Sequence, residues 1–211
     1  MVIVQRLVAV VLAAVLCLPA ALGAGRTIVV VGDSLSSGFG LAAEQSWVAM
    51  LKERLVGEGY GYDVVNASIA GDTSAGGLAR LQRLLDKHAP AVVVIELGGN
   101  DGLRGQPIDA LRDNLAKMIE QSQRSGARVA IAAVQIPPNY GLTYTRALSA
   151  VYPELAQRFN ATLVDLSLAD VALKPELMQG DGIHPNAAGQ KIVFANVWRV
   201  LGPMLAARDA R

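Results

Sequence analysis

Short apolar, β-branched runs alternate with helix-periodic segments along almost the whole chain, and this alternation constrains the fold more than any other feature. Five runs are typical of buried strands: 27–31, 62–67, 92–97, 128–136 and 162–166. Five further segments place apolar residues at helical spacing: 44–56, 74–88, 108–125, 144–159 and 186–206. Strands that alternate with helices form a parallel sheet covered on both faces. We therefore expect an α/β fold: a three-layer α/β/α sandwich, flavodoxin-like, with a five-stranded parallel sheet.

The first 23 residues differ from the rest. Arg6 is the only charged residue before and within an apolar run over 7–18, and the small residues Ala21 and Gly23 follow it. This arrangement is typical of a secretory signal peptide, and the run is too short to span a bilayer comfortably. We expect cleavage after Gly23, with Ala24 as the near alternative and an uncleaved anchor as the rival interpretation. The mature protein would be periplasmic or secreted, without a stable membrane anchor.

Residues 24–211 show no repeat, linker or low-complexity stretch, so we expect them to form a single domain. Within that domain, Pro153 lies inside the helical segment 144–159. A proline inside a helix removes a hydrogen bond and clashes with the preceding turn. We therefore expect the helix to be kinked or divided there.

Charge and composition exclude several classes of function. The chain has 19 Lys and Arg against 18 Asp and Glu, which gives no field for gathering phosphates, so we expect no nucleic-acid partner. Cleavage would also remove Cys17, the only cysteine, and with it any disulfide or thiolate chemistry. His88 and His184 form no paired metal-binding motif, so we expect no metal and no cofactor. An exported enzyme of this kind most simply hydrolyses a small molecule.

Polar, glycine-rich clusters follow the expected strands. They are 32–36 (GDSLS), 66–72 (NASIAGD), 98–101 (GGND) and, before the last helix, 180–185 (GDGIHP). In open α/β sheets the ligand crevice lies beyond the carboxyl ends of the strands. The four clusters are therefore expected to meet at one site.

The four clusters resemble the blocks of the SGNH branch of the GDSL-type serine hydrolases, which centre on a Ser, a Gly, an Asn and a His. The segments 65–77, 96–105, 138–141 and 178–186 are similar to bacterial periplasmic members with thioesterase, lysophospholipase and arylesterase activity. The resemblance implies that Ser34 is the nucleophile, His184 the base and Asp181 its orienting carboxylate. It also implies an oxyanion hole made by the backbone N–H groups of Ser34 and Gly71 and the side chain of Asn100.

The residues themselves favour the same chemistry. A serine hydroxyl needs a base, and the base needs an acceptor that fixes its tautomer. His88 ends a helix at the opposite edge of the sheet, whereas His184 lies three residues after Asp181 in a loop. Each residue also has a structural alternative: Asp181 could cap the last helix, and Asn100 and Gly71 could simply be turn residues. For Asp33, Asp72 and Asp101 we expect loop scaffolding rather than catalysis.

Two other motifs are look-alikes. The stretch Gly32-x-Ser34-x-Ser36 lacks the final glycine of the G-x-S-x-G elbow, which disfavours the ordinary α/β-hydrolase fold. The stretch 38–43 (GFGLAA) imitates a dinucleotide fingerprint but lies several residues past the strand end. We expect no nucleotide cofactor there.

We predict a serine esterase that hydrolyses acyl esters and thioesters through an acyl-Ser34 intermediate. The residues expected to contact substrate are Leu35, Leu103, Pro138 and Tyr140, with Leu41, Ile136 and Pro137 as further candidates for an acyl groove; core packing is the alternative for each. The segment 102–107 is expected to act as a lid. The alternatives are a carbohydrate or other small-group deacetylase and a non-catalytic periplasmic binding protein. We expect a monomer with a small acyl ester or thioester as its partner.

Overall fold

A computed structural model describes residues 26–166 and 171–206 of the chain. The expected signal peptide lies outside the described residues. Five parallel strands form one sheet in the order β2-β1-β3-β4-β5. Their bounds are β1 Thr27–Gly32, β2 Asp63–Asn66, β3 Val92–Glu96, β4 Arg128–Ala133 and β5 Thr162–Asp165. The predicted parallel α/β sandwich is therefore confirmed.

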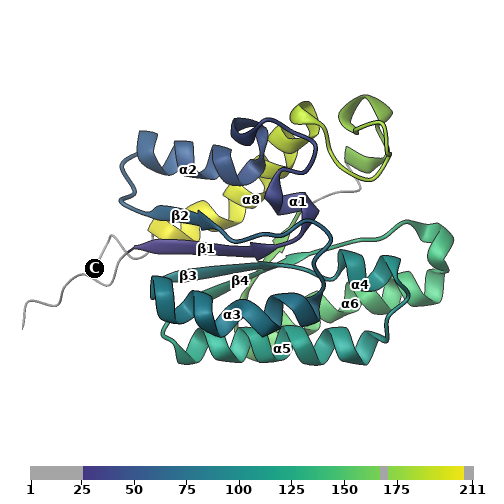
Figure 1. Cartoon of the computed structure of the whole chain (residues 1–211), viewed down its shortest axis with the longest axis horizontal. Coiled ribbons are helices and arrows are strands. Elements are labelled where there is room, and N and C mark those ends of the chain that lie inside the picture. The colour runs from purple at the N-terminus through teal and green to yellow at the C-terminus, as the bar shows by residue number, and fades with distance from the viewer. Residues whose placement is uncertain (1–25, 167–170, 207–211) are drawn as a thin grey trace, which may run out of the picture.

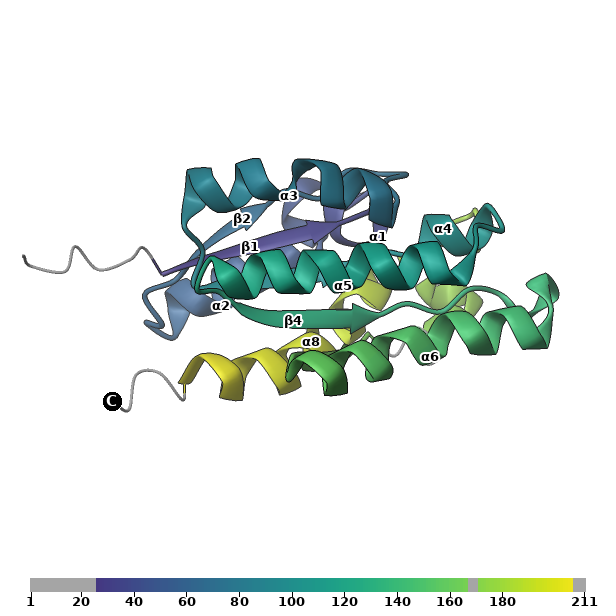
Figure 2. The same ribbon diagram turned by 90° about the horizontal axis from the view of Figure 1, so that it is seen from below.

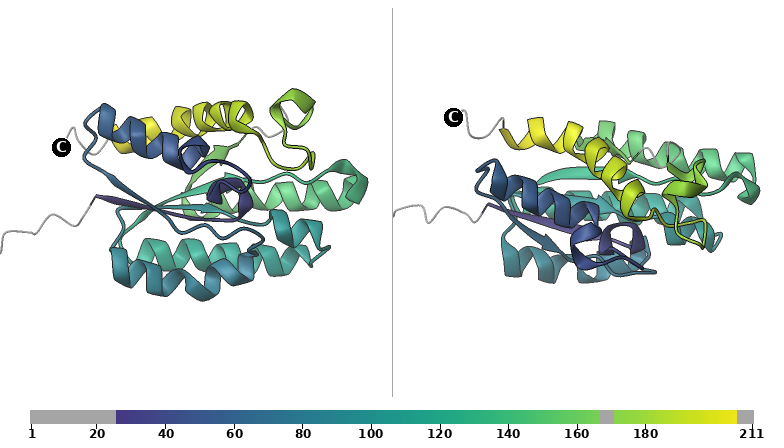
Figure 3. Two further views of the ribbon diagram at one scale, coloured as in Figure 1. Left: turned by 45° about the horizontal axis from the view of Figure 1, so that its top comes forward. Right: turned by 90° about the horizontal axis from the view of Figure 1, so that it is seen from above.

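Helices cover both faces of this sheet (Figures 1 and 2). One layer contains α3, α5 and α6, and the other contains α2 and α8, which lie side by side over the sheet in Figure 3. Their bounds are α2 Trp47–Gly57, α3 Ser74–His88, α5 Ile108–Arg124, α6 Leu142–Phe159 and α8 Ala187–Ala206. No helix of the described ranges is long and apolar enough to cross a membrane.

The two faces of β1 show why the sheet needs both layers. Val29 and Val31 point into the core under α3 and α5, whereas Ile28 and Val30 point into the core under α2 and α8. All four side chains are fully buried. Alternate residues of a strand face opposite sides, so a run that is apolar at every position forms a strand buried on both faces.

Most boundaries lie within two residues of the predictions, and the larger differences concern three elements. Ser46 divides the segment 44–56, because its hydroxyl accepts the Ala49 N–H and caps α2, leaving a 3₁₀ turn, η1, over Ala43–Gln45. The strand expected over 128–136 ends at Ala133. Of the two outcomes expected at Pro153, a kink or a division, the division does not occur, because α6 continues through the proline.

The continuity of α6 at Pro153 has a packing explanation. Val151, Tyr152 and Leu155 flank the proline and are all fully buried in the core. Most helical stability in proteins comes from packing of such a face rather than from each backbone bond. Burial on both sides of Pro153 therefore outweighs the single hydrogen bond that the proline cannot donate.

Candidate active site

The nucleophile predicted from sequence lies at the carboxyl edge of the sheet, at the start of the short helix α1 (Ser34–Ser37), which follows β1 directly. β1 lies between β2 and β3, at the point where the strand order changes direction. Ligands of open α/β sheets bind at such points. In Figure 1 the strands run towards α1 and α4 (Gly99–Leu103), so the residues after β1 and β3 meet there.

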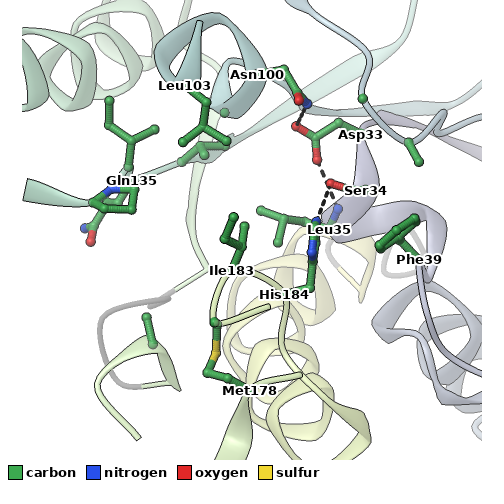
Figure 4. Close-up of a pocket in the computed structure, with 18 of the residues that line it drawn as sticks. Asp33, Ser34, Leu35, Phe39, Asn100, Leu103, Gln135, Met178, Ile183 and His184 are labelled. Atoms are coloured by element: carbon green, nitrogen blue, oxygen red, sulfur yellow. Dashed lines mark hydrogen bonds between the residues drawn. The ribbon is translucent and has the colours of Figure 1, made fainter. Parts of the chain in front are cut away.

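Ser34, His184 and Asp181 form one hydrogen-bonded chain (Figure 4 shows Ser34 and His184). The Ser34 Oγ lies 2.8 Å from His184 Nε2, and His184 Nδ1 lies 2.6 Å from Asp181 Oδ2. If Nδ1 donates to the carboxylate, Nε2 is left with a lone pair facing the serine hydroxyl. This is the geometry that general-base activation of a serine requires.

The loop before α8 holds the aspartate and the histidine in this position. The Asp181 Oδ1 accepts the backbone N–H groups of Ile183, at 2.9 Å, and His184, at 3.0 Å. Desolvation acts to raise the pKa of Asp181, but the hydrogen bonds from the His184 side chain and from these N–H groups lower it to about 2. Asp181 does not cap α8, since Asn186 Oδ1 accepts the N–H groups there.

Asn100 and Gly71 complete the set of predicted site residues. Asn100 belongs to α4, and its Nδ2 donates to Asp33 Oδ2 at 3.0 Å. Because an amide carries two N–H donors, the second one is left for a ligand. Gly71 has φ +79°, a conformation that favours glycine, and its carbonyl accepts a hydrogen bond from Arg104 at 2.9 Å. Ser34, Gly71 and Asn100 line the same cavity.

Asp72 and Asp101 make the loop contacts expected of scaffolding residues. Asp72 accepts the Thr73 N–H and pairs with Arg80 at 2.9 Å. Asp101 is buried and accepts both the backbone N–H and the hydroxyl of Ser74. The Asp72 carboxylate thus ties the loop after β2 to α3, and the Asp101 carboxylate ties α4 to the start of α3.

Asp33 is buried and accepts the Leu35 N–H at 3.0 Å as well as the Asn100 amide. Desolvation raises the pKa of Asp33 to about 6 despite these hydrogen bonds. Beneath it lies Glu96, the last residue of β3, which is fully buried. The site prediction missed Glu96. A single acidic residue at the end of an apolar strand is nevertheless a signal, because acidic side chains are rarely buried unless they have a polar partner.

A cavity of about 720 Å³ opens beside Ser34 and His184. Of the predicted substrate residues, Leu35, Leu103 and Pro138 line it, whereas Tyr140 and Leu41 do not. Tyr140 lies in the 3₁₀ turn η2 (Pro138–Tyr140) and is 41% exposed.

The rest of the lining comes from the stretch expected to continue β4 and from residues around the other segments that were not predicted to contact substrate. Residues that the site prediction missed are Phe39, Val134, Gln135, Ala172, Leu173, Met178 and Ile183; Ile136 and Pro137 were named as groove candidates. Figure 4 shows Leu103 and Gln135 on one side of Ser34 and Phe39 on the other. Phe39 packs on the His184 ring with a centroid distance of 4.9 Å. The cavity is therefore mostly apolar, with the polar chain at its edge.

Two observations bear on metal and nucleotide binding. Within 26–166 and 171–206, no group of three or more His, Cys, Asp or Glu side chains could hold a metal ion. The glycine-rich stretch 38–43 forms the turn after α1, where Gly40 packs against the side chain of Gln179. A bound nucleotide would have to displace that contact.

The chain is similar to several known proteins. The GDSL-like Lipase/Acylhydrolase family matches residues 30–192. Esterase TesA of Pseudomonas aeruginosa PAO1 is 52% identical over 182 residues, which are 86% of this chain and 90% of that protein. Thioesterase 1/protease 1/lysophospholipase L1 of Escherichia coli K12 is 40% identical over 182 residues, 86% of each chain.

The solved structures include the psychrotrophic esterase EstA from Pseudoalteromonas sp., inhibited by monoethylphosphonate, which matches with a TM-score of 0.82 and 37% identity. The match covers 86% of this chain and 99% of EstA. The resemblance carried by the four sequence clusters is thus confirmed over most of the chain. The protein belongs to the GDSL-like lipase/acylhydrolase family.

Proposed function

We propose that this protein is a serine esterase that hydrolyses acyl esters and thioesters. The observation that supports the proposal best is the hydrogen-bonded chain from Ser34 through His184 to Asp181 at the edge of an apolar cavity. The relatives named esterase and thioesterase 1/lysophospholipase L1 support the same class of reaction.

In the first half of the reaction, His184 Nε2 takes the proton of the Ser34 hydroxyl while Oγ attacks the acyl carbonyl carbon. Asp181, ionised because its pKa is about 2, balances the charge of the imidazolium that forms. The carbonyl oxygen becomes an oxyanion, for which the N–H groups of Ser34 and Gly71 and the free amide N–H of Asn100 are the donors. These assignments make Ser34, Asp181 and His184 catalytic and add Gly71 and Asn100 as the oxyanion hole.

The imidazolium then gives its proton to the leaving alcohol or thiol, and the acyl group stays on Ser34. In the second half, His184 removes a proton from water, which attacks the acyl carbonyl carbon. The acid leaves, and Ser34 recovers its proton from the histidine. No other proton donor or acceptor is required.

The apolar lining of the cavity favours an acyl chain over a sugar. Leu35, Leu103, Ile136 and Pro138 present apolar surface close to Ser34, and a carbohydrate would leave its hydroxyl groups there without partners. A carbohydrate deacetylase is therefore the less favoured function. Leu103 ends α4 within this lining. We propose that the segment 102–107, which contains Leu103, acts as the lid of the acyl site.

The cellular setting follows from the sequence. We infer that residues 1–23 are a signal peptide, that 24–211 form one domain acting as a monomer, and that the enzyme is periplasmic or secreted. Expression of the full chain, followed by fractionation and N-terminal sequencing, tests this. A mature protein beginning at Ala24 is expected, and retention of Met1 on a membrane-bound product would contradict it.

Purified mature protein should hydrolyse p-nitrophenyl esters, long-chain acyl-CoA and lysophospholipid faster than acetylated sugars. Ser34→Ala should abolish all of these activities while the fold is retained, because a partly exposed hydroxyl contributes little to stability. Faster release of acetate from sugars than of long acyl groups would favour the deacetylase. A wild-type protein that turns over none of the substrates would favour a non-catalytic binding protein.

A further inference from the structure

Glu96 lies directly beneath the turn that carries Ser34. Its Oε2 accepts the Ser36 hydroxyl at 2.7 Å and the backbone N–H of Asp33 at 3.3 Å. These two residues lie on either side of Ser34 in the chain, so one carboxyl group holds the nucleophile turn at both ends. Gly32 makes the approach possible, because a Cβ at that position would lie 2.8 Å from Glu96 Oε2.

The surroundings of Glu96 do not suit a charged carboxylate. The side chain is fully buried, and its Oε1 has no hydrogen-bond partner among the described residues. None of the ion pairs in the described part of the chain includes Glu96. Its nearest acidic neighbour, Asp33, is buried as well. Burial, followed by the charge of Asp33, raises the pKa of Glu96 well above its usual range.

Asp33 is the better place for the single charge. It accepts the Leu35 N–H and the Asn100 amide, two donors that stabilise an ionised carboxylate. The hydrogen bond from Asn100 to Asp33 occupies one N–H of the amide and so directs the other towards the cavity. A second negative charge on Glu96 would oppose the oxyanion that forms above it.

We propose that Glu96 is a positioning residue for Ser34 that keeps its proton throughout turnover, so that the buried pair of Asp33 and Glu96 carries one negative charge, on Asp33. The inference rests on the proposed esterase function. It assigns Glu96 no contact with substrate: its effect reaches the reaction through Asp33, Ser36 and the turn between them.

Substitutions separate shape from charge. Glu96→Gln keeps an uncharged side chain of the same size whose oxygen can accept both hydrogen bonds, so kcat should stay within about 3-fold of wild type. Glu96→Ala removes both bonds and lets the turn shift, which should lower kcat about 10- to 100-fold with little change in KM. Retention of activity in the glutamine variant and its loss in the alanine variant is the expected pair of results.

Ser36 provides a second test, and Ser122 provides its matched control. Ser36→Ala removes the hydroxyl that donates to Glu96, whereas Ser122→Ala removes a fully buried hydroxyl that donates to the Met118 carbonyl at 2.8 Å, inside α5. Both should lower the melting temperature. Only Ser36→Ala should also lower kcat, and it should slow the inactivation of Ser34 by a phosphonate. Equal kcat in the two serine variants would overturn the positioning role.

Infrared spectroscopy tests the proton without relying on activity. At pH 7 the spectrum of the mature wild-type protein minus that of Glu96→Gln should contain the C=O band of one protonated carboxylic acid. Only a carboxylate band in that difference would overturn the uncharged state, as would a glutamine variant as inactive as Glu96→Ala. If Glu96→Ala does not fold, the Ser36→Ala variant and the infrared difference still decide. A wild-type protein that hydrolyses no ester refutes the esterase function instead, a result distinct from all of these.

Discussion

Replacing Asn100 by alanine should impair catalysis and stability separately, because its amide has two separate roles. One N–H donates to Asp33 Oδ2 at 3.0 Å, and we propose that the other donates to the substrate oxyanion. Loss of one oxyanion donor typically lowers kcat by 10²- to 10³-fold, about 3 to 4 kcal/mol. Loss of a hydrogen bond to a buried carboxylate costs a further 1.5 to 3 kcal/mol or so of folding free energy. Asn100→Ala should therefore have both a lower melting temperature and a much lower kcat.

The assay must keep these two effects apart. We expect kcat for a p-nitrophenyl ester, measured well below the melting temperature and divided by the concentration of phosphonate-titrated Ser34, to fall by about 10²-fold or more with KM little changed. Asn114→Ala is the matched control, since its amide donates to the Ser74 hydroxyl at 3.0 Å but does not line the cavity. That variant should lose stability and keep kcat. A kcat for Asn100→Ala within a few-fold of wild type would exclude Asn100 from the oxyanion hole.

Three further substitutions follow from particular contacts. Asp181→Asn should lower kcat by about 10³-fold or more. Because the pKa of Asp181 is lowered to about 2, its ionised form stabilises the fold above about pH 4, and this stabilisation is lost as pH falls through about 2. The unfolding free energies of wild type and variant should therefore converge near pH 2, and a difference that is independent of pH would contradict the role of the ionised carboxylate. Leu103→Ala should weaken long-acyl substrates by about 1 to 2 kcal/mol more than acetyl ones in kcat/KM, and equal losses would remove Leu103 from the acyl site. Gly77→Ala should lower the free energy of unfolding in urea by about 1 to 3 kcal/mol, because a Cβ there would lie 2.2 Å from Leu97 Cδ1. Gly57→Ala is the control and should be neutral, because a Cβ there would have nothing within 4 Å. An equal loss of stability in both variants would refute the packing argument.

The sheet could be predicted from sequence because its central strands are short and β-branched, with β1 ending on Gly32 and β3 followed closely by Gly98 and Gly99. Val92–Glu96, for example, is apolar until its last residue and pairs in parallel with β1 and β4. Most helices could be predicted because their apolar residues recur at helical spacing. The meeting of Ser34, Asn100 and His184 also followed, since carboxyl strand ends share one edge. A strand pattern therefore predicts that the loop after the strand lies at the carboxyl edge of the sheet.

Other features depend on contacts between segments distant in the chain. The place of Glu96 at the end of an apolar strand marks it in the sequence, but its contacts with the backbone after Gly32 and with Ser36 arise only in the folded chain. Phe39 lines the site and contacts Gln179, 140 residues later in the chain, whose side chain donates to the Phe39 carbonyl. The helices α1 and α4 are too short for a periodic pattern to reveal them. Such features follow from tertiary packing, which no local window of sequence contains.

The central claim is that Ser34 becomes covalently acylated, and trapping tests it most directly. The mature protein is incubated with an alkyl p-nitrophenyl phosphonate, digested and examined by mass spectrometry, with Ser34→Ala and Ser37→Ala treated in parallel. We predict one phosphonyl group per wild-type and Ser37→Ala chain, carried on Ser34, and none on Ser34→Ala. Labelling of another residue, or a Ser34→Ala variant that keeps more than about a hundredth of the wild-type kcat, would contradict the account.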